Sequence, residues 1–108
     1  TPLDTTDGVF FISADGDAGL DFLVEKDNSA TTTEDVATMA DDTFITVTWF
    51  IDPDASKVFY SVNNAAPVGV ANTNLPDDEE LTVSFGIQNG EAAAKTMTID
   101  YVVAAVER

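Results

Sequence analysis

Carboxylates spaced along a glycine-containing turn are the residues of this sequence that come nearest to a metal site. Asp15, Asp17 and Asp21 alternate with small or apolar residues, as ligands do at the start of an oxygen-rich calcium loop. An EF-hand loop beginning at Asp15 would need glycine at its sixth position and glutamate at its twelfth, but the sequence has Leu20 and Lys26 there. The EF-hand interpretation therefore fails.

A calcium site built from several turns is a separate hypothesis, because other acids also fall in predicted turns. These are Asp52, Asp54, Asp77 and Asp78. The competing interpretation is that Asp and Gly are ordinary turn residues in a very acidic chain, since their side chains and backbone suit tight reversals. Both interpretations stay open here, and no metal ligand is assigned.

Adjacent acids offer a second kind of chemistry, that of glycosidases. The pairs are residues 41–42, 77–78 and 79–80. A glycosidase needs two carboxyl groups that face each other across a sugar, about 5 to 10 Å apart, whereas neighbours in a polar loop point apart. The sequence has no His and no Cys, and no spacing pairs a Ser or Thr with a Lys or carboxylate base. We therefore predict a protein that is not an enzyme, with no catalytic residue and no cofactor.

Four phenylalanines alternate with the main apolar positions of their segments: Phe11, Phe44, Phe50 and Phe59. On the opposite face they would form a sugar-stacking platform or a protein-binding patch, because exposed apolar clusters mark interaction surfaces. Alternatively, they pack beneath the other sheet or a long loop. The sequence does not choose between these alternatives.

The segment that must position these side chains is a long hairpin at residues 43–62. Ile45, Val47, Trp49 and Ile51 fall on one face of its first half, with threonines between them, which is the period of a half-buried strand. The second half repeats this alternation. Residues 52–56 (DPDAS) lie between the halves and predict a chain reversal.

Further alternating runs predict additional strands on both sides of this hairpin. They lie at residues 8–13, 20–26, 66–70, 81–88 and about 95–106, and residues 27–42 are predicted as strand and loop rather than helix. The residues expected to face inward are Trp49, Tyr60, Phe85, Ile87, Ile99 and Tyr101. Seven or eight strands at this spacing, separated by turns, predict an all-β antiparallel β-sandwich.

Length and charge limit the number of domains and the kinds of partner that the chain is expected to have. A chain of 108 residues with 44% hydrophobic residues is predicted to form one domain, residues 1–108, and its start at Thr1 is compatible with a piece of a longer chain. Twenty acidic residues against four basic ones give a formal net charge of -16. Nucleic acids and anionic membranes are bound through Lys and Arg, so neither is expected as a direct partner. No apolar run approaches the roughly 20 residues of a membrane helix.

The second half of the sequence resembles laminin-G and concanavalin-like jelly rolls. The resemblance rests on FITVTWFID, KVFYSVNN, the Phe85-Gly86 strand and Ile99-Asp100-Tyr101 near the end. More narrowly, residues 75–102 (LPDDEELTVSFGIQNGEAAAKTMTIDYV) are similar to the C-terminal region of tailed-phage virion proteins that decorate or cement the capsid. The Glu-x-Asp-x-x-Glu motif of the glucanase members is missing, which argues against the hydrolytic activity of those members.

This resemblance implies a jelly-roll virion structural protein. The expected location is the outer surface of a bacteriophage capsid, and the expected partners are the major capsid protein and further copies of the chain in a homo-oligomer. A lectin-like carbohydrate-binding module, assisted by calcium, is the alternative function.

Overall fold

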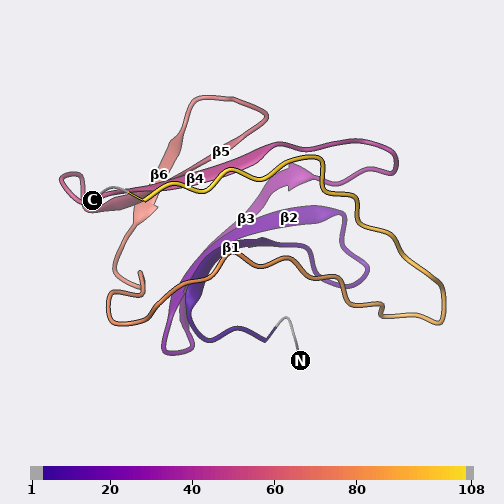
Figure 1. Cartoon of the computed structure of the whole chain (residues 1–108), viewed down its shortest axis with the longest axis horizontal. Coiled ribbons are helices and arrows are strands. Elements are labelled where there is room, and N and C mark those ends of the chain that lie inside the picture. The colour runs from indigo at the N-terminus through magenta and orange to yellow at the C-terminus, as the bar shows by residue number, and fades with distance from the viewer. Residues whose placement is uncertain (1–3, 107–108) are drawn as a thin grey trace.

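The computed structural model describes residues 4–106, which form six strands in two antiparallel sheets and contain no helix. Sheet A consists of β1 (Gly8–Ile12), β2 (Gly19–Lys26) and β3 (Ser29–Thr38), in the order β1-β2-β3. Sheet B consists of β4 (Val47–Asp52), β5 (Lys57–Val62) and β6 (Val68–Ala71), in the order β4-β5-β6. Figure 1 shows the two sheets as neighbouring layers. The prediction of an all-β, antiparallel protein is confirmed.

Sheet A is a meander in which a two-residue turn joins β2 to β3. Asp27 and Asn28 in this turn have positive φ angles of 50° and 61°, and these residue types tolerate that conformation. The Asp27 amide donates a hydrogen bond of 2.9 Å to the Asp7 side chain, and this bond connects the turn to the segment before β1. Residues 29–38 are therefore strand, as predicted for this ambiguous stretch.

Sheet B contains the predicted central hairpin. Trp49 lies opposite Tyr60, and the turn closes through a hydrogen bond from the Ser56 amide to the Pro53 carbonyl at 3.1 Å. Asn63 and Asn64 then turn the chain toward β6 with positive φ angles of 50° and 59°. Both turns use the residues that the sequence indicated for them.

The core forms where the two sheets face each other. Phe22, Val24 and Val58 are fully buried, and Phe22 packs against Tyr60 of the other sheet with ring centroids 4.8 Å apart. Phe11 joins this cluster, 5.0 Å from Phe22. Of the two alternatives that the sequence leaves open for Phe11, the structure shows packing beneath the other sheet, because Phe11 pairs with Phe22 in the register and both rings face inward.

The chain after β6 departs from the sequence prediction. Residues 81–88 and 95–106 were expected as strands, but no strand follows Ala71 within the described residues. In Figure 1 the orange and yellow trace runs along the sheets without forming an arrow. Alternation specifies the two faces of a strand, whereas a strand also needs a neighbour's hydrogen-bonding edge, which local sequence does not specify. The described chain thus has six strands rather than seven or eight.

Several residues expected in the core lie at the surface as a result. Phe85 and Tyr101 are 56% and 65% exposed, and Ile87 and Ile99 are also exposed. Trp49, the largest residue of the predicted core, is 38% exposed although it shares a face with the core residue Tyr60. The inner face of β4 is therefore only partly covered.

Candidate interaction surface

The outer face of sheet B carries three cross-strand pairs of different chemistry. Along β4 and β5, Thr48 lies opposite Ser61, Phe50 opposite Phe59, and Asp52 opposite Lys57. Their neighbours in each strand, Trp49 and Tyr60 among them, point to the core side because strand residues alternate between faces. We call the six residues of these three pairs, together with Gly69 of β6, the outer patch.

Two stacked phenylalanines occupy the middle of the outer patch. The Phe50 and Phe59 rings lie 5.1 Å apart at an interplanar angle of 13°. Gly69 faces Phe59 across β5 and β6, and a Cβ at this glycine would lie 2.8 Å from both the Phe59 ring and the Lys57 side chain. Real Cβ atoms do not approach so closely, so glycine at position 69 leaves room for the aromatic ring over the sheet.

The sequence left open whether the four phenylalanines form an exposed patch or pack beneath a sheet or loop, and the exposure of the rings decides part of this question. Phe50 is 45% exposed and Phe59 is half-buried, so the pair presents apolar surface to solvent. Phe44, which precedes β4, is 67% exposed. Of the four phenylalanines, only Phe11 takes the buried alternative. A partly exposed aromatic pair with hydroxyl groups on one side and charged groups on the other suits contact with another molecule.

The turn carboxylates act on the chain's own backbone. The Oδ1 atom of Asp17 accepts a hydrogen bond from the Gly19 amide at 2.8 Å, and that of Asp52 accepts one from Ala55 at 3.1 Å. Asp21 accepts a hydrogen bond from the Asp35 amide at 2.8 Å, beside the bulge of β2 and β3. Among residues 4–106, no group of three or more His, Cys, Asp or Glu residues is arranged to hold a metal ion. The contacts of Asp17 and Asp52 are those of ordinary turn residues, whereas Asp21 lies within β2.

Two further acids, Asp77 and Asp78, form ion pairs with Lys26. Lys26 pairs closely with Asp77, and its Nζ lies 3.3 Å from Oδ1 of Asp78. The hydrogen bond from Lys26 lowers the pKa of Asp77, and the same contact raises the pKa of Lys26. These ion pairs thus join the connection after β6 to the end of β2.

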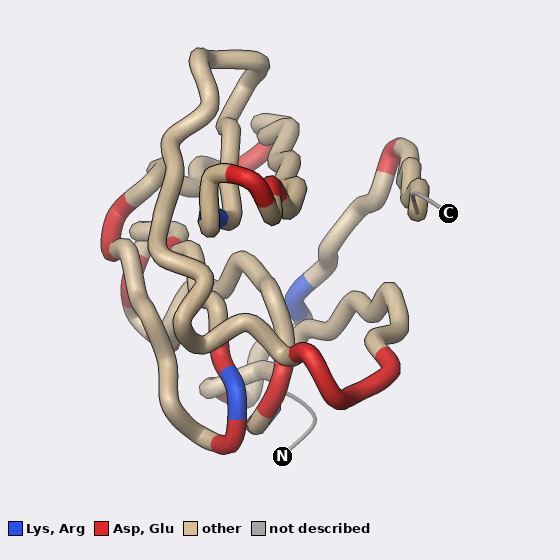
Figure 2. The backbone as a smooth tube through the Cα atoms, turned by 90° about the vertical axis from the view of Figure 1, so that its left-hand side faces the viewer, with Lys and Arg blue, Asp and Glu red and all other residues tan. Residues whose placement is uncertain are grey.

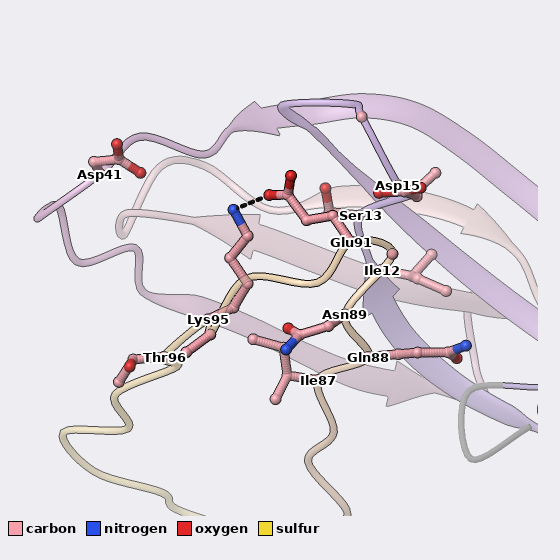
Figure 3. Close-up of a pocket in the computed structure, with 14 residues that line it drawn as sticks. Ile12, Ser13, Asp15, Asp41, Ile87, Gln88, Asn89, Glu91, Lys95 and Thr96 are labelled. Atoms are coloured by element: carbon pink, nitrogen blue, oxygen red, sulfur yellow. Dashed lines mark ion pairs between the residues drawn. The ribbon is translucent and has the colours of Figure 1, made fainter.

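An open pocket of about 1060 Å³ lies at one end of the molecule, between the loop after β1, Asp41 and residues 87–96. Figure 3 shows Lys95 paired with Glu91, whose Oε1 lies 2.5 Å from Nζ, with Asp15 and Asp41 nearby. The Ser13 hydroxyl, which also lines the pocket, donates a hydrogen bond to the Asp17 carbonyl at 2.8 Å.

Acidic residues dominate the surface around these sites. Figure 2 shows Asp and Glu along many parts of the backbone, whereas the basic positions are isolated from one another. This distribution makes phosphate-rich surfaces unfavourable partners and basic surfaces favourable ones.

Comparisons of this chain with protein-family models, curated proteins and solved structures found no match. In the described part of the chain, no helix has the length and apolarity needed to cross a membrane.

Proposed function

We propose that this chain is a non-enzymatic structural protein of a tailed-phage virion, bound to the outer surface of the capsid. It would decorate or cement the shell through contacts with the major capsid protein and with further copies of itself. In this proposal the fold is a jelly roll of the concanavalin and laminin-G type. The sequence resemblance of residues 75–102 supports the virion assignment.

The observation that carries the proposed contact is the outer patch. It exposes a stacked aromatic pair on the face of sheet B that is turned away from the core. Aromatic residues at the centre of a patch, with polar groups at its rim, are typical of protein interfaces. The net charge of -16 is compatible with a position outside the shell, away from packaged nucleic acid, and favours a basic docking surface.

Binding to capsids tests this function directly. Purified chain is mixed with capsids built from the major capsid protein of the same genome, and the bound fraction is measured by cosedimentation. We expect saturable binding that Phe50→Ala weakens at least tenfold, since truncation of a central aromatic residue commonly costs about 2 kcal/mol or more. Phe10→Ala is the matched control, because Phe10 is a half-buried aromatic residue on the outer face of sheet A.

Two results would overturn the capsid proposal: no saturable binding by the unmodified chain, or equal losses for Phe50→Ala and Phe10→Ala. Cryo-electron microscopy of the loaded particles would then show whether the copies form the proposed homo-oligomer at regular lattice positions.

One observation favours the carbohydrate-binding alternative. Because β4 is an edge strand of sheet B, the side of the Phe50 ring away from Phe59 has no neighbouring strand, and Thr48 beside it is exposed. A free ring face next to hydroxyl groups is able to stack on a sugar ring. Binding to a glycan array that is lost in Phe50→Ala, together with a rise in melting temperature on adding the sugar, would support this alternative.

A further inference from the structure

Asn89 and Gly90 lie together in the exposed connection between residues 81–88 and 95–106. Asn89 is the only asparagine of the sequence that is followed by glycine, and both residues are exposed. Figure 3 shows the Asn89 side chain among those that line the open pocket at this end of the molecule. Glycine has no Cβ to shield its amide nitrogen, so this nitrogen is able to attack the side chain of the residue before it.

The backbone around Asn89 is not held in a tight turn. An Asn-Gly pair that closes a two-residue hairpin of the usual kind has positive φ angles at both residues. Neither Asn89 nor Gly90 has a positive φ angle, and no strand of the described chain flanks them. Within residues 4–106, neither the Asn89 side chain nor the Gly90 amide forms a hydrogen bond. The dihedral angles that bring the Gly90 nitrogen to Cγ of Asn89 are therefore free to change.

The other asparagines have different surroundings. Oδ1 of Asn63 accepts a hydrogen bond from the Thr46 amide at 3.0 Å, and Nδ2 of Asn74 donates one to the Thr31 hydroxyl at 3.0 Å. Every asparagine except Asn89 is also followed by a residue with a side chain. Asn89 thus differs from them both in its freedom to move and in the residue that follows it.

Contact with Asp15 accounts for the glycine at position 90. A Cβ at Gly90 would collide with the Asp15 carboxylate, which belongs to the loop after β1. Any residue other than glycine would therefore push this loop and the Asn89 segment apart. The packing at this end of the molecule thus keeps beside Asn89 the one residue type that leaves its side-chain carbonyl open to attack.

We propose that Asn89 is a site of spontaneous deamidation. The Gly90 nitrogen forms a bond to Cγ of Asn89 and closes a cyclic imide, while the bond from Cγ to Nδ2 breaks and Nδ2 leaves as ammonia with the proton of the Gly90 amide. Water then opens the imide at one of its two carbonyl carbons. Cleavage between the nitrogen and Cγ gives aspartate. Cleavage between the nitrogen and the main-chain carbonyl carbon gives isoaspartate, in which the main chain runs through Cβ and Cγ.

The reaction changes the charge of the end pocket. Its lining contains the acids Asp15, Asp41 and Glu91 and a single cation, Lys95, which pairs with Glu91. A carboxylate at position 89 adds one more acid to this group, so repulsion within the pocket increases. Isoaspartate also lengthens the main chain by one carbon. The modification concerns this pocket alone and does not depend on the proposed capsid function.

Incubation of the intact chain in neutral buffer tests the site. Peptide mapping by mass spectrometry measures the conversion of amide to acid at each asparagine, and labelling with an isoaspartate methyltransferase measures isoaspartate. We expect Asn89 to react about tenfold or more faster than any other asparagine, and within about tenfold of its rate in a free peptide of residues 86–93. A rate at Asn89 no higher than that of the other asparagines overturns the proposal, as does a rate further below that of the free peptide.

Substitutions at the pair separate the attack from the packing. Gly90→Ala shields the nitrogen but also collides with the Asp15 carboxylate, so it is made in a chain that carries Asp15→Ala. We expect the double variant to deamidate at Asn89 about tenfold more slowly than Asp15→Ala alone, because the added methyl group hinders ring closure. Asn89→Gln is the matched control for ammonia release, which should fall to the level of the remaining asparagines. Equal rates in the double variant and in Asp15→Ala contradict attack by the Gly90 nitrogen.

Discussion

Truncation of Phe22 measures how much of the stability depends on the contact between the sheets. Phe22 is fully buried, and its ring packs against Phe11 and Tyr60 at 5.0 and 4.8 Å. Replacement of a buried Phe by Ala costs about 3 to 5 kcal/mol, because it removes apolar contacts and leaves a cavity. Each aromatic pair adds about 0.5 to 1.5 kcal/mol beyond burial, which places Phe22→Ala near the upper end of that range.

Urea denaturation followed by circular dichroism measures this loss. With an m-value of about 1 to 3 kcal/mol per M for a small protein, a loss of about 5 kcal/mol should lower the midpoint by roughly 2 to 5 M while m stays unchanged. Leu23→Ala is the control, because Leu23 is the next residue of β2, lies on the outer face and is only half-buried. We expect it to cost about 1 kcal/mol. Equal losses for the two variants would refute the assignment of Phe22 to the centre of the core.

Three further measurements test the turns and the charges. Asn64, with φ of 59°, should accept glycine without loss, whereas Asn64→Val should lower stability in urea by about 1 to 2 kcal/mol; equal stability of the two variants would contradict the turn. Asp77→Asn should lower the melting temperature at neutral pH, because the lowered pKa of Asp77 makes its ion pair stabilising above the ordinary carboxyl pKa. That contribution disappears as pH falls through the folded-state pKa, so wild type and variant should converge in acid. The raised pKa of Lys26 gives a contribution that is complete below its ordinary pKa and is lost as pH rises through the folded-state value. Added NaCl should raise the melting temperature by screening the charge of -16, and a flat salt dependence would contradict self-repulsion.

The sequence predicted β1 to β6 closely because local chemistry determines them. Asp27-Asn28 and Asn63-Asn64 supply residues that tolerate positive φ, and Pro53 stands inside the reversal between β4 and β5. The alternation of Val58 and Tyr60 also identified the inner face of β5. Each of these features depends on only a few neighbouring residues, so it can be predicted from a short stretch of sequence.

The position of Phe11 and the state of residues 81–106 were not predictable in the same way. Both depend on which strand lies alongside, and that choice is made between segments far apart in the chain. Phe11 is surrounded by apolar residues on both sides, so its inward face is determined only by its register with Phe22. For residues 81–88, the alternation of apolar and polar residues predicted the two faces of a strand. It did not identify another strand with which these residues would pair.

The outer patch was only partly foreseen. The four phenylalanines were recognised as candidates, but the stacking of Phe50 on Phe59 follows from a register that the hairpin turn establishes. Gly69 gave no signal in the sequence, because its role appears only when β6 lies beside β5. Asp17 and Asp52 accept hydrogen bonds from backbone amides, as the turn interpretation predicts.

β1 and β4 each stand at an edge of their sheet, which bears on how the protein behaves at high concentration. An unpaired edge is a template for strands of other molecules, and natural sheets often protect such edges with charge. Here the protection comes from the charge of the whole chain, since each approaching copy also carries -16. The same salt that stabilises one folded chain removes this repulsion between chains. Ionic strength therefore acts in two directions, and turbidity should appear in concentrated samples at high salt or near the isoelectric point of about 4.1.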